Sequence, residues 1–403
     1  MSFKLSKVNS WDEFSPLKTM ILGSVFDTSF FDAIKNNKIQ YALKKVFDET
    51  QEDLEAFKTT MVSHGIRVHH AYPQEMGYKD SIMDYIDDKG RIGWTGGAEM
   101  TRTNLVPAPP LQVRDETIVM GNQVFVTEGA FTVEMLRSHY CEWFGEENCN
   151  FGVLDGRITG RRTNQSINSW LKRFGKEKGF GDKTSHDQLT VEELNVINEK
   201  HRVPGFCAPN ITRIGKDCLV DVWQTPDIKP IMEKEYPAFN YKEIYLTGHN
   251  DSIFSILRPG LVIASNWAKE RELYKSMPNW DIHYFEDPNW GKLDKFLELK
   301  QINRGKWWVP GQEDNLEFTN FVEKYLGEMV GEVEETVFDV NCLVLDDKHI
   351  VVNSDNPDLY KLLRQHNLEP IFCPFRNRFF FDGGWHCLTL DIERTGTQQD
   401  YGL

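Results

Sequence analysis

The sequence has no long apolar run and no closely spaced pair of cysteines. No stretch approaches the roughly 18 apolar residues that a membrane-spanning helix needs. The opening residues, MSFKLSKVNSWDEF, contain no apolar run of the kind found in signal peptides. The seven cysteines form no CxxC motif, so neither a zinc site nor a redox motif is indicated. An odd number of cysteines without a secretion signal predicts reduced thiols and a cytoplasmic protein.

Acidic residues outnumber basic residues. The 46 lysines and arginines face 61 aspartates and glutamates, which gives a formal net charge of -15 at pH 7. Nucleic acid is therefore not expected as a partner, because binding phosphates requires a basic surface. Hydrophobic residues make up 40% of the chain, enough for a globular core. The 403 residues suffice for one large domain or for two to three ordinary ones, and we interpret residues 1–403 as a single domain.

A pattern of two short apolar strands around a polar or glycine turn recurs along the chain. The copy at residues 116–127 is the clearest, with Gly121 and Asn122 at its turn. Further copies are predicted at residues 211–222, 252–265 and 342–353, and a shorter first copy at residues 17–26. Five such modules predict a closed, pseudo-symmetric α/β fold. An ordinary mixed α+β sheet is the alternative.

Helices are expected between these hairpins. Residues 41–65 carry apolar side chains at helical spacing and end at a glycine. Residues 189–201 open with Thr190 and Glu193 at the spacing of a capping box. Residues 356–367 form a short amphipathic pattern. The sequence therefore predicts three helices at these positions.

The segment 71–110 interrupts this alternation and is rich in glycine, threonine and proline. Long connections of this kind are often functional. One interpretation is a loop over a site, carrying Trp94, Glu99, Met100 and Arg102. The other is a surface excursion without a role.

Polar residues stand at the start of several predicted hairpins. These residues are Asp115, Asn210, His249 with Asp251, and Asn341. If the modules surround an axis, these side chains converge on one cavity together with Cys387 from the stretch FDGGWHCLTLDIERTG. A thiol needs a base or a positive neighbour to ionise, which His249 supplies. Paired carboxylates bind a planar cation through bidentate hydrogen bonds. Each residue alone has a plainer interpretation, as a turn residue or a buried apolar thiol.

Six segments together resemble one enzyme family. VNSWDEFSPLKTMILG, VRDETIVMGN, RIGKD, HNDSIFSILRPGLVIASN, VNCLVLDDK and GGWHCLTLDIERTGTQQDY are similar to segments of the amidinotransferases, which include arginine:glycine and inosamine-phosphate amidinotransferases. The end of the last segment, LDIERTGTQQDY, looks more like the transferases than like the related deiminases. The resemblance implies the pentein fold, a five-bladed α/β propeller with pseudo-fivefold symmetry around a central active site.

The resemblance also implies roles by position. Cys387 matches the nucleophile of the family, and His386 before it belongs to the same motif. His249 matches the general acid/base. Asp115 and Asp251 match the carboxylates that hold the guanidinium group of the substrate.

Two positions depart from the family pattern, and a third is not fixed. Asn210 stands where the family has a catalytic aspartate, and an Asn for Asp change in a serine triad costs about 10⁴ in turnover. Asp339 replaces a serine that helps to bind the donor's carboxylate in the eukaryotic arginine enzymes. The carboxylate-binding arginine of the family falls near Lys269 or Arg271. Cysteine, histidine and asparagine also suggest a papain-like protease, but here the cysteine comes last and no protease motif surrounds it.

The predicted function is that of an amidinotransferase. It would move an amidino group from a guanidino donor, with L-arginine expected, to an amine through an amidino-cysteine intermediate. The alternatives are a guanidine-modifying hydrolase of deiminase type, and a catalytically weakened binding protein on the same scaffold. This chemistry needs no cofactor and no metal. The expected partners are small molecules, with neither nucleic acid nor membrane, and a homodimer is compatible with the resemblance.

Overall fold

The computed structural model describes most of the chain. The described residues are 6–86, 106–127, 139–151, 153–154, 157–159, 167–168, 170–203, 206–223, 226, 228–246, 248–285, 307–327, 329–331, 339–353 and 355–403. Trp94, Glu99, Met100 and Arg102 of the predicted loop lie outside these residues. Among the described helices, none is both long enough and apolar enough to cross a membrane.

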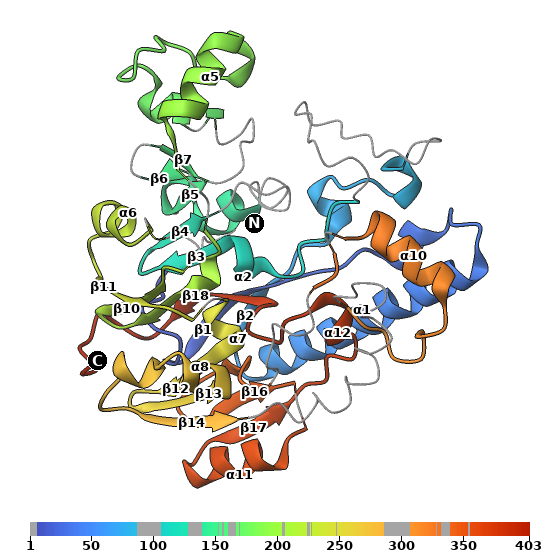
Figure 1. Ribbon diagram of the computed structural model, residues 1–403, viewed down its shortest axis with the longest axis vertical. Coiled ribbons are helices and arrows are strands. Elements are labelled where there is room, and N and C mark those ends of the chain that lie inside the picture. Colours follow the sequence, from blue (N-terminus) through green and yellow to red (C-terminus); the bar gives the residue numbers. More distant parts are fainter. Residues whose placement is uncertain are drawn as a thin grey trace.

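The described strands form six separate three-stranded sheets (Figure 1). Each sheet repeats one pattern, in which two antiparallel strands are followed by a strand parallel to the central one. The sheets are β18 (Thr389–Arg394), β1 (Leu17–Leu22), β2 (Arg67–His69); β3 (Thr117–Met120), β4 (Gln123–Val126), β5 (Cys149–Phe151); β6 (Val153–Leu154), β7 (Arg157–Thr159), β8 (Arg202–Val203); β9 (Ile211–Ile214), β10 (Asp217–Asp221), β11 (Asn240–Ile244); β12 (Phe254–Arg258), β13 (Leu261–Ser265), β14 (Asp281–Phe285); and β15 (Leu343–Val344), β16 (His349–Val352), β17 (Glu369–Phe372). The described strands therefore do not merge into one mixed sheet.

Four of the five predicted hairpins are confirmed. They are the pairs β3–β4, β9–β10, β12–β13 and β15–β16. Three of the turns contain a glycine in a conformation that favours glycine, while the turn of β15–β16 is formed by polar residues. Gly121 and Gly260 adopt φ values of 58° and 83°, which residues with a side chain rarely adopt.

The predicted first hairpin, at residues 17–26, is wrong. β1 pairs antiparallel with β18, so that Leu22 lies opposite Thr389, and pairs parallel with β2. Gly23 marks no turn here. It is needed because a Cβ atom at this position would overlap the carbonyl group of Leu111. The first sheet is thus closed by a strand from a distant part of the sequence.

The three predicted helices are confirmed, with one boundary shifted. α1 (Asn37–Ser63) begins four residues before the predicted range, since Asn36 caps it by accepting hydrogen bonds from two backbone N–H groups. α5 (Val191–Lys200) carries the predicted capping box. α11 (Pro357–Gln365) packs its apolar face into the core.

The remaining described α-helices are short. They are α2 (Val113–Glu116), α6 (Ile228–Glu235), α7 (Asn250–Ile253), α8 (Asn266–Glu270), α10 (Leu316–Tyr325) and α12 (Arg378–Phe381). Large apolar clusters join α1 with β1 and β18, α11 with β12–β16, and α6 with β9–β11. A small separate cluster around Trp170 lies in the segment that carries α5, at the upper end of Figure 1.

A buried carboxylate on β18 connects several sheets. Asp391 accepts hydrogen bonds from Arg114 Nη2 (2.7 Å), Arg213 Nη2 (2.9 Å) and Arg394 Nε (3.1 Å). Burial acts to raise the pKa of Asp391, but the three guanidinium groups hold it well below its usual value. Arg394 also donates to the carbonyl group of Val344 on β15 (3.0 Å). This group therefore ties β18 to α2, β9 and β15.

Replacing this carboxylate should destabilise the fold. We expect Asp391→Asn to lower the free energy of unfolding by about 3–5 kcal/mol, because it leaves buried arginine charges uncompensated. The urea midpoint, followed by circular dichroism, measures the effect. Asp182→Asn, which breaks the exposed Lys176–Asp182 pair, is the control and should change little. Equal midpoints for the two variants would contradict this role of Asp391.

Candidate active site

Three short helical turns precede hairpins and lie close together. The 3₁₀ turn Ala208–Asn210 contacts both α2 and α7. Each contact brings together parts of different sheets, as the repeated pattern predicts. The turns carry three predicted site residues, namely Asp115, Asn210 and Asp251.

Cys387 lies where these turns meet, and its side chain is buried. Its thiol donates a hydrogen bond to Asp251 Oδ2 over 3.2 Å. The Nδ2 group of Asn341 donates to the sulfur over 2.9 Å. The structure thus joins the predicted nucleophile directly to one predicted guanidinium-binding carboxylate.

Two glycines allow the turn that presents this thiol. Gly383 has a φ of 77°, and a Cβ atom on it would lie 2.8 Å from the Cβ of Cys387. A Cβ on Gly384 would lie 2.6 Å from the carbonyl oxygen of Asn341. Contacts this short are not tolerated, so the two glycines of GGWHC are needed for a tightly packed turn.

Asn341 holds the backbone of the same turn. Its Oδ1 accepts hydrogen bonds from the N–H groups of Gly384 (3.0 Å), His386 (3.2 Å) and Cys387 (3.3 Å). Its Nδ2 also donates to the carbonyl group of Asp251 over 3.2 Å. The sequence marked Asn341 only by its place before a hairpin, whereas the structure shows one amide that positions both the nucleophile and a carboxylate.

His386 links Asp251 to the buried charges behind the site. Its Nδ1 lies 2.9 Å from Asp251 Oδ2, and its Nε2 lies 3.3 Å from Glu13 Oε2. Glu13 in turn accepts a hydrogen bond from Arg213 Nε over 2.9 Å. Sequence reasoning assigned no role to Glu13, although it lies in one of the six matching segments.

Asp251 is ionised at any physiological pH. Burial acts to raise its pKa, but the hydrogen bond and charge of His386, together with His249 and Arg114, lower it to about 2. One oxygen, Oδ1, is buried and accepts no hydrogen bond from the described residues. A donor on a bound ligand can therefore use this oxygen.

His249 forms the open side of the site with Asp115. Their side chains are 30% and 31% exposed, and His249 Nδ1 lies 3.9 Å from Asp115 Oδ1. Burial acts to lower the pKa of His249, but a hydrogen bond with Cys207 and the charge of Asp115 raise it to about 10. His249 is therefore an imidazolium near neutral pH, ready to donate a proton.

Asn210 lies in the same group of turns, but no hydrogen bond between the described residues joins it to His249. Its side chain is buried, and its Oδ1 accepts no hydrogen bond from the described residues. Cys207, three residues before Asn210, is among the groups that raise the pKa of His249. Sequence reasoning did not name Cys207, because the resemblance to the amidinotransferases placed the partner of His249 at position 210.

Asp339 contacts the start of α11, and Lys269 lies on α8. Asp339 is fully buried and accepts a hydrogen bond from Asn356 Nδ2, at the start of α11, over 2.9 Å. Lys269 is exposed on α8, with its Nζ 5.8 Å from the ring centre of Tyr284. Arg271, the alternative to Lys269, stacks on the Trp267 ring at 4.6 Å.

The thiol of Cys387 is neutral in the free protein. Burial, followed by the charges of Asp251 and Asp115, raises its pKa well above the usual value, while the hydrogen bond from Asn341 acts in the opposite direction. A cation between these carboxylates would offset their effect on the sulfur. The site is thus arranged so that a cationic ligand favours the thiolate.

A cavity of about 20 Å³ lies beside these groups, with Glu13, Arg114, Asp251 and His386 in its wall. This volume holds about one water molecule. It is too small for a guanidino substrate. Apolar side chains, including Ile118, Ile211 and Phe254, form much of the rest of its wall.

No family model matches the chain. Over 256 residues it is 24% identical to the mitochondrial glycine amidinotransferase of Xenopus tropicalis, a match that covers 58% of this chain and 53% of that protein. The chain thus spans about half the length of the curated relatives it matches. Over 62 residues it is 39% identical to the L-arginine:L-lysine amidinotransferase of Pseudomonas savastanoi pv. phaseolicola, covering 15% of this chain and 17% of that one.

Two solved structures match nearly the whole chain. An amidinotransferase of the saxitoxin biosynthetic pathway from Microseira wollei superposes with a TM-score of 0.60 at 18% identity, covering 98% of this chain and 99% of that one. Inosamine-phosphate amidinotransferase from Streptomyces griseus gives a TM-score of 0.58 at 18% identity, with the same coverage. The resemblance to the amidinotransferases is confirmed. The chain shares the mixed α/β fold of these two amidinotransferases.

The charge of His249 can be tested by nuclear magnetic resonance. We expect its imidazole to titrate with a pKa of about 10 and Asp115→Asn to lower that value, because a neighbouring negative charge is lost. Since the folded-state pKa is raised, its stabilising effect is present below pH 6.5 and disappears as the pH rises through 10. His283, on the surface, serves as the reference resonance. A neutral His249 at pH 8 would contradict the prediction.

Proposed function

We propose that this protein is an amidinotransferase that works through an amidino-cysteine intermediate. One observation carries the proposal: the thiol of Cys387 donates to Asp251 while the imidazolium of His249 pairs with Asp115 beside it. A nucleophile, two carboxylates for a planar cation and a proton donor are the groups this reaction needs. The relatedness to amidinotransferases supports the same conclusion.

The guanidinium group of the donor would lie between Asp115 and Asp251. A guanidinium group has N–H donors in a fixed plane, which suits carboxylate acceptors. The buried Oδ1 atoms of Asp251 and Asn210 would accept two of these donors. In this proposal five of the three-stranded sheets are the blades of a propeller, and the site lies on its pseudo-fivefold axis.

Transfer of the amidino group would proceed in two steps. With the cation bound, the Cys387 thiol loses its proton to solvent, and the thiolate attacks the central guanidino carbon. The bond from this carbon to the leaving nitrogen breaks, and His249 donates its proton to the leaving amine. The acceptor amine then attacks the amidino carbon and gives a proton to His249, and the carbon–sulfur bond breaks to restore the thiolate. The N–H group of Asn341 stabilises the sulfur anion in both steps.

L-arginine is the proposed donor. Because Asp339 is buried and bonded to Asn356, its charge is directed to the start of α11. Lys269 or Arg271 would bind the donor's carboxylate.

We further propose a cytoplasmic location, and a homodimer as the assembly. Attack by water in place of the acceptor amine would instead make a ureido product, so product analysis separates transferase from hydrolase.

The decisive experiment is an intact mass measurement after incubation with L-arginine alone. We expect the protein to gain one amidino group and Cys387→Ser to gain none. If arginine leaves no adduct, a panel of other guanidino compounds follows. Absence of any adduct or turnover with the whole panel would overturn the proposal in favour of a binding protein.

Asn341→Ala should impair the reaction without unfolding the protein. We expect the rate of adduct formation to fall by about 10²-fold, comparable to losing one donor to a developing anion. Quenched-flow sampling followed by mass analysis measures this rate. Asn315→Ala, which removes the asparagine that caps α10, is the control and should react at nearly the wild-type rate. Equal rates in the two variants would argue against a role for Asn341.

A further inference from the structure

A group of three metal-ligand side chains lies outside the candidate active site. Asp281 and His283 are two residues apart on β14 and so face the same side of that strand. His366 follows the last residue of α11. The ligand atoms of the three side chains all lie within 4.8 Å of one another. No other group of three or more such side chains meets this condition in the described part of the chain.

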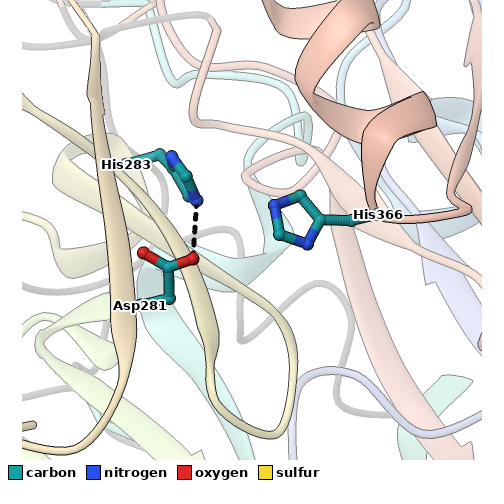
Figure 2. A group of neighbouring side chains, drawn as sticks. All are labelled: Asp281, His283 and His366. Atoms are coloured by element: carbon teal, nitrogen blue, oxygen red, sulfur yellow. Dashed lines mark hydrogen bonds and ion pairs between the residues drawn. The ribbon is translucent and has the colours of Figure 1, made fainter.

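Figure 2 shows how the side chains approach. His283 Nε2 lies 3.0 Å from Asp281 Oδ2, and the ring of His366 faces this pair from across the gap. The centres of the two imidazole rings are 5.3 Å apart, with their planes at 66°. One ring nitrogen of His366 is directed at His283, so three donor atoms surround a common point.

The group lies where two sheets meet. β14 is an edge strand of the sheet β12–β13–β14, while α11 connects β16 to β17 in the next sheet. Arg258, at the end of β12, donates to the carbonyl group of His366 over 3.0 Å. A ligand held by all three side chains would therefore connect the two sheets.

We propose that Asp281, His283 and His366 bind a divalent transition-metal ion such as Zn²⁺. Two imidazoles and one carboxylate form a ligand set that favours zinc, nickel, cobalt or copper over calcium and magnesium. The side chains are partly exposed, so water can complete the coordination. The ion would replace the His283–Asp281 hydrogen bond and stabilise the junction of the two sheets.

Arg258 should weaken this site. Its Nη2 lies 3.5 Å from His366 Nδ1, at the limit of a hydrogen bond. Coordination through Nε2 places the proton of a neutral imidazole on Nδ1, which then needs an acceptor, and arginine can only donate. Glutamine offers a carbonyl acceptor in place of this guanidinium. We therefore expect Arg258→Gln to bind the metal more tightly than the wild type.

A second group of two histidines and one aspartate serves as a matched comparison. His349 Nδ1 lies 3.0 Å from both oxygens of Asp346, and its ring is 5.5 Å from that of His64 at 67°. His64 uses its Nδ1 to bond the carbonyl group of Thr60. This second His–His–Asp arrangement has almost the same ring geometry, yet its ligand atoms do not converge.

The test is a calorimetric titration of the full chain with Zn²⁺, and separately with Co²⁺ to detect sulfur ligands by absorption. All variants carry Cys387→Ser, so the reactive thiol is absent. We expect one equivalent to bind, with affinity at least tenfold weaker in His283→Ala and His366→Ala, unchanged in His349→Ala and tighter in Arg258→Gln. The melting temperature should rise with metal only where binding persists.

Two results would overturn the proposal. One is the absence of binding at millimolar metal. The other is an equal affinity in His366→Ala and His349→Ala, which would indicate adventitious binding by surface histidines. The melting temperatures without metal verify that each variant is folded. None of these measurements depends on amidino transfer.

Discussion

The buried carboxylate of Asp391 is the interaction on which the rest of this structure depends. Three arginines from α2, β9 and β18 donate to it, and each arginine reaches a different part of the chain. Isolating such charges from water is costly, so they are tolerated only as a fully paired group. The sheets therefore have one mutual arrangement in which every member of this group has its partner. Apolar packing alone is less directional.

The candidate active site takes its geometry from the same group. Arg114 donates from Nε to the carbonyl groups of His386 and Thr389, which lie on either side of Cys387 and its following residue. Glu13 joins Arg213 to His386, and His386 joins Asp251. Hydrogen bonds thus run without a break from the centre of the fold to the carboxylate beside the thiol. Placement of the reactive groups is a consequence of how the sheets are joined.

Local chemistry explains what the sequence could predict. Gly121 and Gly260 require unusual backbone angles, so their hairpins were recognisable, and the helix that begins after Thr190 was recognisable from its capping box. The polar residues at the hairpin starts could be named because the hairpins themselves were recognisable.

What the sequence could not predict depends on contacts between distant residues. The partner of β1 lies in β18, so no local turn signal reveals it. Asn341 was named as a hairpin-start residue, but its hydrogen bonds to the backbone around Cys387 could not be predicted from the sequence. Glu13 contacts His386 from the other end of the chain, and a glutamate is not unusual in its own segment.

The pairing of β1 with β18 has a consequence for synthesis of the protein. During translation β1 emerges early, and its antiparallel partner is made several hundred residues later. Until then one edge of the first sheet offers unpaired N–H and C=O groups, an arrangement that invites association with other chains. The strand that closes this edge directly follows Cys387. Before β18 has emerged from the ribosome, the chain therefore has neither a complete first sheet nor an assembled nucleophile, so closure of this sheet and acquisition of reactivity coincide.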